Sequence, residues 1–130
     1  MIIDTSAIIA ILHDEPEAET YFQAINDAAM RRMSAATYFE AAIVIDVNRD
    51  PILSRRLDEI VRDAAIAIEP VTFNQVQIAR EAYRDYGRRS GHPARLNFGD
   101  CFAYALAKDM GEALLFKGED FSRTDVAVAK

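Results

Sequence analysis

The sequence predicts an α/β domain of three layers, in which helices cover both faces of a central, mainly parallel sheet of four to five short strands. Short apolar segments alternate with longer segments whose apolar residues follow helical spacing. The short segments are apolar throughout, as buried parallel strands are. The chain has 130 residues, of which 51% are hydrophobic and 28% charged, and this balance predicts one globular domain over residues 1–130.

The first half of the chain is predicted to hold two strands and four helices. Asp50 and Pro51 form a typical helix start, and Asp14, with Pro16 in the first turn and Glu17 after it, forms another. The predicted elements are a strand over 1–4, a helix over 5–12, a helix from 14 to about 30, a strand over 32–35, a helix to about 48 and a helix from 50 to about 64.

The second half is predicted to hold three strands and two helices. Thr72 and Gln75 have the spacing of a capping box, and Gly111 is typical of the residue just past a helix end. The predicted elements are a strand over 65–71, a helix over 72–86, a loop over 87–95, a helix from 97 to near 111, a strand over 113–116 and a small strand over 126–128.

Two charged residues lie at the carboxyl ends of predicted strands. Asp4 comes after Met1-Ile2-Ile3, and Lys117 comes after the strand that ends at Phe116. Sites in parallel α/β sheets lie at the carboxyl ends of the strands, so both residues are candidates for a site there. The alternative for Asp4 is a structural role as the N-cap of the helix that begins at Thr5.

Glu40 interrupts an apolar stripe of the third predicted helix. The stripe consists of Ala36, Glu40, Ile43, Val44 and Val47, and the sequence predicts that it faces the core. A buried carboxylate must be paired, protonated or bound to a metal. The alternative is that Glu40 lies at the edge of the stripe with its carboxylate in water.

Two further carboxylates lie in the last third of the chain. Asp100 follows Asn97 by three residues, which fits either a helix cap or a site, and Gly99 between them leaves space for a ligand. Asp120 lies in the loop after the strand over 113–116, beside Glu119, which competes for any role given to Asp120. Carboxylates from separate elements would meet at one end of the sheet, and oxygen ligands suit Mg²⁺ or Mn²⁺.

Composition excludes several other classes of protein. The net charge of −6 argues against binding of nucleic acid by bulk charge alone, and one cysteine cannot form an internal disulfide. Cys101 shares a helical stripe with Phe98 and Phe102, so core packing is its predicted role. No apolar stretch is long enough to span a membrane, and no signal peptide is recognisable, so a cytoplasmic protein is expected.

Four segments together resemble PIN-domain nucleases, most closely the VapC toxins of toxin–antitoxin pairs. They are MIIDTSAIIAIL, MSAATYFEA, LNFGDCFAYALAK and LLFKGEDFSRTDV, and the resemblance covers essentially the whole chain. It implies a PIN-like fold and a metal-dependent endoribonuclease that hydrolyses phosphodiester bonds of transfer or ribosomal RNA by metal-activated water.

The resemblance also assigns roles to individual residues. It implies that the acids Asp4, Glu40, Asp100 and Asp120 hold one or two Mg²⁺ or Mn²⁺ ions and carry the catalysis, with Asp120 favoured over Glu119 as the fourth acid. Ser6 and Asn97 resemble supporting polar residues of the site. The implied partners are a cognate VapB-type antitoxin, the RNA substrate and a second copy of the chain in a homodimer.

Positive charge near the proposed acids is local. Arg95 and Lys117 each lie within five residues of a proposed metal ligand, so both are predicted to contact phosphates of the substrate. Lys117 is also compatible with a receiver-type signalling domain, which carries a lysine after a late strand. That alternative lacks a phospho-acceptor Asp, because Glu69-Pro70 occupies the corresponding region. A catalytically silent PIN-like binding module is the other alternative.

Overall fold

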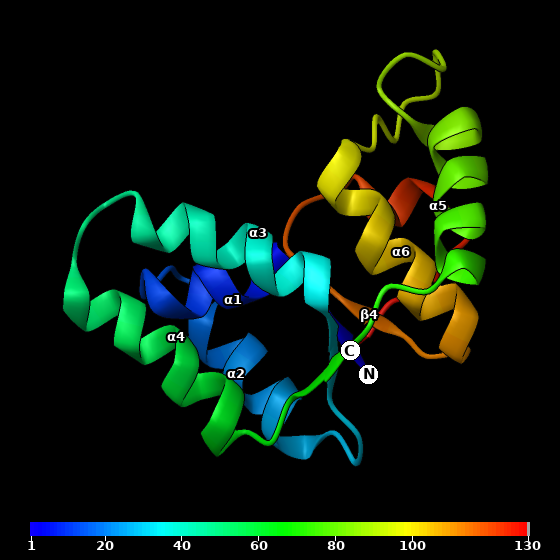
Figure 1. The fold of residues 1–130 in the computed structure, drawn as a ribbon. Helices are drawn as coiled ribbons and strands as arrows, with labels where there is room; N and C mark the ends of the chain where they lie inside the picture. Colours follow the sequence, from blue (N-terminus) through cyan, green and yellow to red (C-terminus); the bar gives the residue numbers. More distant parts are fainter. Residues whose placement is uncertain (130) are drawn as a thin grey trace.

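The computed structural model describes residues 1–129 and shows helices packed around a small sheet (Figure 1). In chain order the elements are β1 (Ile2–Ile3), α1 (Thr5–Leu12), α2 (Ala18–Asp27), β2 (Arg32–Ser34), α3 (Ala35–Asp46), α4 (Pro51–Asp63), β3 (Ala67–Glu69), α5 (Phe73–Tyr86), α6 (Phe98–Met110), β4 (Leu114–Leu115) and the 3-10 helix η1 (Phe121–Arg123). None of the described helices combines the length and the apolar character needed to cross a membrane.

The four strands form one parallel sheet in the order β3-β2-β1-β4. Ile2 pairs with both Arg32 and Leu114, so β1 lies in the interior of the sheet. The predicted last strand contributes only a single parallel bridge, between Val128 and Leu114. The prediction of a parallel sheet of four to five strands is therefore confirmed, with four strands and one bridge.

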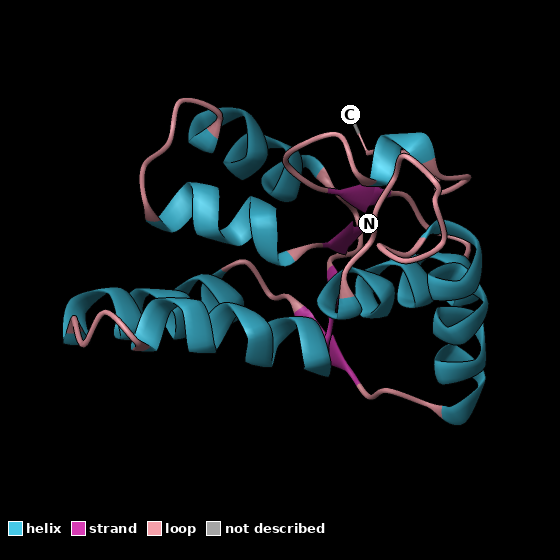
Figure 2. Cartoon of the chain, turned by 90° about the horizontal axis from the view of Figure 1, so that it is seen from above, coloured by secondary structure: helices cyan, strands magenta, loops and turns pink. Residues whose placement is uncertain are grey.

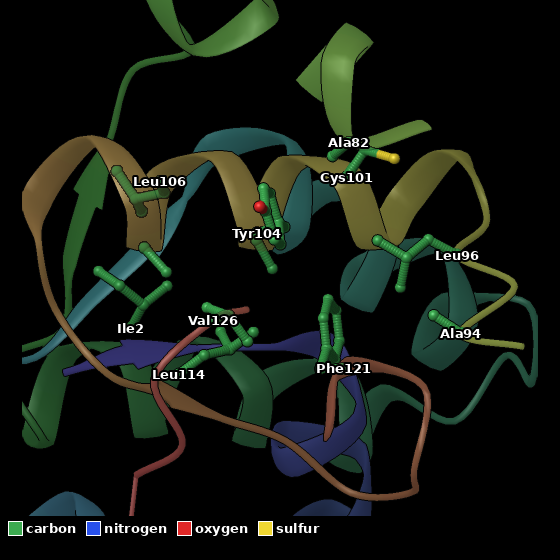
Figure 3. Close-up of a cluster of buried hydrophobic side chains, with 12 residues drawn as sticks. Ile2, Ala82, Ala94, Leu96, Cys101, Tyr104, Leu106, Leu114, Phe121 and Val126 are labelled. Carbon is green, nitrogen blue, oxygen red and sulfur yellow. The ribbon is translucent and has the colours of Figure 1, made fainter. Parts of the chain in front are cut away.

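Different helices cover the two faces of the sheet (Figure 2). Ile2 and Leu114 pack against α5 and α6, in a core that also holds Tyr104 and Phe121 (Figure 3). Their neighbours Ile3 and Leu115 lie in the second core, which is built from α1 to α4. Because successive side chains of a strand point to opposite faces, two-residue strands suffice to join the cores into three layers.

Most of the predicted helix ends are confirmed. The Asp50 side chain accepts from the backbone N–H of Ile52 at 2.9 Å, and Gly111 adopts the left-handed conformation after α6, with φ 64°. Only half of the predicted capping box forms at α5. Thr72 accepts from the backbone N–H of Gln75 at 3.1 Å, but the Gln75 side chain bonds to Asp109 of α6 instead.

The predicted boundaries of the second helix are wrong. Asp14 has a positive φ of 50° and lies in a turn, and α2 begins four residues later at Ala18. Glu17 precedes α2 without any side-chain capping bond. The helix also ends at Asp27 rather than near Met30. The turn over 13–17 thus brings Glu15 and Glu17 toward the carboxyl edge of the sheet, where they pair with Lys117, two residues after β4.

Candidate active site

A cavity of about 420 Å³ opens at the carboxyl end of β1. It is bordered by the first turns of α1 and α6, the middle of α3 and the segment that follows β4. Its lining residues are Asp4, Thr5, Ser6, Ile9, Glu15, Glu40, Val44, Asn97, Asp100 and Lys117. Three of the four predicted acids and both predicted supporting residues therefore meet in one place, at the edge of the sheet where α/β proteins bind ligands.

Asp4 both caps α1 and lines the cavity. Its Oδ2 accepts from the backbone N–H of Ser6 at 3.0 Å and from the Ser6 hydroxyl at 2.7 Å, which caps α1. Its Oδ1 is buried and has no hydrogen-bond partner among the described residues. Burial raises the pKa of Asp4, an effect that the bonds from Ser6 oppose and the charge of Glu40 reinforces.

Glu40 does not lie on a core-facing stripe, so that prediction is wrong. The buried face of α3 consists of Thr37, Ala41 and Ile45. Glu40 is half-buried, and its predicted companion Val47 is exposed. Glu40 instead accepts a hydrogen bond of 2.6 Å from the hydroxyl of Thr5, which fixes the carboxylate beside Asp4.

Thr5 also lines the cavity, and the sequence did not single it out. It lies directly between Asp4 and Ser6, and its hydroxyl bonds to Glu40 although the two residues are 35 positions apart. The only signal in the sequence was the hydroxyl of Thr5 beside a candidate acid. Nothing in the spacing of residues on α1 indicated which side chain of α3 that hydroxyl would contact.

Gly99 brings α6 against the Glu40 carboxylate. A Cβ atom built on Gly99 would lie 1.8 Å from Glu40 Oε2, so no larger residue fits without displacing the carboxylate. The sequence had predicted that the missing side chain leaves space for a ligand. The space is taken by Glu40, and Gly99 thereby allows the second and third acids to come together.

Asp100 forms a reciprocal capping box with Asn97. The Asp100 backbone N–H donates to Asn97 Oδ1 at 2.8 Å, and the Asn97 backbone N–H donates to Asp100 Oδ2 at 2.9 Å. Burial raises the pKa of Asp100 to about 7, and the charges of Asp4, Asp120 and Glu40 add to this effect while the bond from Asn97 opposes it. A carboxyl group with this pKa is protonated in about half of the molecules near neutral pH.

Asp120 lies outside the cavity lining but within electrostatic range of it. It is exposed in the loop before η1, and its charge contributes to the raised pKa of Asp100. Glu119 is 82% exposed in its side chain and pairs with Arg123 at 3.4 Å. Glu119 is not among the charges that act on Asp100, which favours Asp120 as the fourth acid.

The two predicted substrate contacts differ in their surroundings. Lys117 lines the cavity, and its ammonium lies 2.8 Å from Glu15 and 3.0 Å from Glu17, ion pairs that raise its pKa. Arg95 is exposed, has a positive φ of 54°, and forms no ion pair with any residue in the range 1–129. Arg95 therefore has its guanidinium available for a ligand, whereas the Lys117 charge is already compensated.

The donor set of the cavity fits a hard divalent cation. Asp4, Glu40 and Asp100 supply carboxylate oxygens, and Asp4 Oδ1 is a buried acceptor that lacks a donor within residues 1–129. Such an oxygen is costly to bury unless a cation or a proton satisfies it. The carboxylates of residues 1–129 are not yet gathered into a complete shell, because no three acidic, histidine or cysteine side chains lie close enough together to hold an ion.

Comparison with known proteins identifies the family. Residues 1–127 match the PIN domain family. Ribonuclease VapC28 of Mycobacterium tuberculosis is 58% identical over 126 residues, which is 97% of this chain and 95% of the relative. Ribonuclease VapC of Mycolicibacterium smegmatis is 51% identical over 127 residues, which is 98% of each chain.

Solved structures agree on the fold. The Mycobacterium tuberculosis toxin VapC20, described as cleaving the sarcin–ricin loop, has a TM-score of 0.75 at 17% identity and aligns over 97% of this chain and 95% of its own. A toxin–antitoxin complex from Klebsiella pneumoniae has a TM-score of 0.74 at 16% identity, with 98% and 94% covered. With the sequence relatives, this likeness leads to one conclusion: the chain belongs to the PIN-domain family and, within it, to the VapC ribonucleases.

Proposed function

We propose that the chain is the toxin of a toxin–antitoxin pair and cuts RNA as a divalent-metal-dependent endoribonuclease. The observation that supports the proposal best is the meeting of Asp4, Glu40 and Asp100 in one cavity, where Asp4 keeps a buried oxygen without a hydrogen-bond partner in the described part of the chain. A receiver-type signalling domain, the first alternative, is incompatible with membership of the PIN family.

The finer parts of the proposal rest on relatives. The VapC20 toxin is described as cleaving the sarcin–ricin loop, which supports ribosomal RNA as a substrate, with transfer RNA as the other candidate class. The Klebsiella pneumoniae neighbour is a toxin–antitoxin complex, which supports a VapB-type antitoxin as partner. We further propose that the protein acts in the cytoplasm as a homodimer.

The side chains in and near the cavity have different roles in the proposed reaction. A bound Mg²⁺ or Mn²⁺ ion supplies positive charge for the phosphate oxygens and lowers the pKa of water in the site. Asp4, Glu40 and Asp100 hold the first ion, and Asp120 completes a second position or orients the attacking water. Ser6 and Asn97 fix the directions of Asp4 and Asp100 through the bonds described above. Arg95 contacts a phosphate of the substrate.

The test is cleavage of total cellular RNA by the purified, antitoxin-free chain with Mg²⁺, with Mn²⁺ and with EDTA. The matched variants are Asp4→Asn and Asp100→Asn, and Asp63→Asn on the exposed end of α4 is the control. We expect cuts at few sites, mapped by sequencing the ends, that disappear with EDTA and fall by roughly a thousandfold in both site variants.

Absence of cleavage with either metal, in folded protein free of antitoxin, would contradict the proposal. It would favour the second alternative, a catalytically silent PIN-like binding module. Titration with Mn²⁺ then tests this alternative, because a silent module is expected to bind the ion poorly. Cleavage that persists in EDTA would show that the carboxylates act without a metal.

A further inference from the structure

Lys117 connects three parts of the candidate site. Its ammonium is held by Glu15 and Glu17 of the turn between α1 and α2, at 2.8 and 3.0 Å. Its backbone N–H donates to the Ser6 hydroxyl oxygen of α1 at 2.9 Å. The segment that follows β4 is therefore attached to the site both by its side chain and by its main chain.

The bond from Lys117 determines where the Ser6 hydroxyl proton points. A serine hydroxyl carries one proton and accepts through its oxygen lone pairs. The Lys117 N–H points at that oxygen, and the proton is left to donate to Asp4 Oδ2 at 2.7 Å. With Oδ2 bonded twice to Ser6, the other oxygen of Asp4 is the one left free in the buried site.

We propose that Lys117 is a positioning residue. Glu15 and Glu17 hold its ammonium, which keeps its backbone N–H on Ser6 and thereby fixes the Asp4 carboxylate for the divalent ion. The three residues Lys117, Glu15 and Glu17 are called the Lys117 latch here. The hydrogen-bond chain stands on the structure alone, whereas the role toward an ion rests on the proposed function.

The charges around Lys117 favour a positioning role over direct contact with the substrate. Two carboxylates surround one ammonium, so the Lys117 latch has a net charge of −1 and does not favour the approach of a phosphate. The sequence predicted a phosphate contact for Lys117, and the two roles give different results for the same variant. Lys117→Met removes the ammonium and keeps most of the apolar stem.

Lys108 supplies a matched control. Its ammonium lies 3.0 Å from Asp125, and its side chain is 38% exposed, as is that of Lys117. Lys108→Met therefore removes a comparable ion pair that has no bond to Ser6. Lys117→Arg keeps the charge and serves as the conservative variant.

The first measurement is hydrogen exchange of the residue-117 backbone amide by NMR in EDTA. We expect exchange roughly three- to tenfold faster in Lys117→Met and in the double variant Glu15→Gln/Glu17→Gln, since exposed ion pairs are individually weak. We expect exchange to stay slow in Lys117→Arg, which keeps the charge, and in Lys108→Met. Unchanged exchange in the first two variants would show that Glu15 and Glu17 do not keep this amide on Ser6, and this result would not depend on metal binding.

The second measurement is Mn²⁺ affinity by calorimetry, together with RNA affinity in EDTA. Removal of a nearby positive charge by itself tightens cation binding, whereas loss of the latch loosens it. We expect Lys117→Met to bind Mn²⁺ roughly three- to tenfold more weakly, with RNA affinity in EDTA unchanged. Tighter or equal Mn²⁺ binding would overturn the positioning role, and weaker RNA binding with unchanged Mn²⁺ affinity would establish the phosphate contact instead.

The two proposals fail in different ways. If the wild-type protein binds no Mn²⁺, the metal dependence of the proposed function fails, and the positioning of an ion fails with it. Amide exchange would still decide whether the latch holds the segment after β4. If the wild-type protein binds Mn²⁺ and Lys117→Met binds it equally well, only the positioning role is lost.

Discussion

The fold changes the ionisation of Asp100 strongly. Burial, opposed by the Asn97 N–H and reinforced by the charges of Asp4, Asp120 and Glu40, raises its pKa from 3.8 to about 7. Between these values the folded protein keeps a proton that the unfolded chain releases. A rise in pH through this range therefore lowers the free energy of unfolding, and the loss is complete above about pH 7.

This linkage predicts the pH dependence of thermal stability in EDTA. The Tm of the wild-type protein, followed by circular dichroism, is expected to fall from about pH 5 to about pH 7.5 more steeply than that of Asp100→Asn. Asparagine keeps an oxygen that can accept from the Asn97 N–H but carries no charge. The control Asp63→Asn should follow the wild type. Equal slopes for Asp100→Asn and the wild type would show that Asp100 ionises normally.

At the scale of elements, the site depends on how closely α6 approaches α3. Alanine in place of a helical glycine normally stabilises a helix by roughly 0.5–1 kcal/mol. At Gly99 the added Cβ would collide with the Glu40 carboxylate, so Gly99→Ala must displace Glu40 or the helix. We expect cleavage to fall by roughly a hundredfold while the protein stays folded, because small displacements of catalytic groups are costly.

Gly111→Ala is the matched control for this prediction. Gly111 has a φ of 64° at the end of α6, and an added Cβ would meet no neighbouring atom. The variant should lose roughly 1 kcal/mol of stability in urea unfolding, through backbone strain, without a specific loss of cleavage. If Gly99→Ala cleaves RNA as well as Gly111→Ala does, the contact between α6 and Glu40 has no functional role.

Elements differ in how far their residues could be assigned from the sequence. Strong local signals, such as Asp50-Pro51 and Gly111, gave correct helix ends because caps act within a few residues. Asp14 also resembled a cap, but its positive φ belongs to a turn, whose geometry depends on contacts made elsewhere. Turns of this kind cannot be distinguished from caps by residue type alone.

In the candidate site, too, the contacts between distant segments could not be predicted from the sequence. Glu40 was singled out for a core-facing stripe that does not form, whereas the meeting of Asp4 and Asp100 could be predicted, because each lies at a strand end or a helix start. The orientation of α3 could not, because both its buried face, with Ala41 and Ile45, and its exposed face, with Val47, are apolar. Contacts such as that between Thr5 and Glu40 join distant segments and leave no periodic pattern.

For the whole molecule, charge and exposed apolar surface have separate consequences. Of the 21 acidic residues behind the formal net charge of −6, four are the acids proposed for the site. An acidic cleft repels RNA, so a divalent cation should tighten substrate binding, and exposed arginines such as Arg95 should contribute to it. Surface remote from the acids remains available for contacts between protein chains.

The exposed face of α3 leads to a prediction about assembly. Phe39, Ile43 and Val47 follow one another at four-residue spacing, with 65%, 47% and 68% of their surface exposed. Contiguous apolar surface of this kind is typical of an interface between proteins.

We expect the isolated chain to be a dimer by light scattering at micromolar concentration, and Phe39→Glu/Val47→Glu to shift it toward the monomer. Ile52→Glu on α4, which is 59% exposed outside this stripe, should remain dimeric. A wild-type monomer would contradict the dimer, and a dimeric double variant would place its interface on another face.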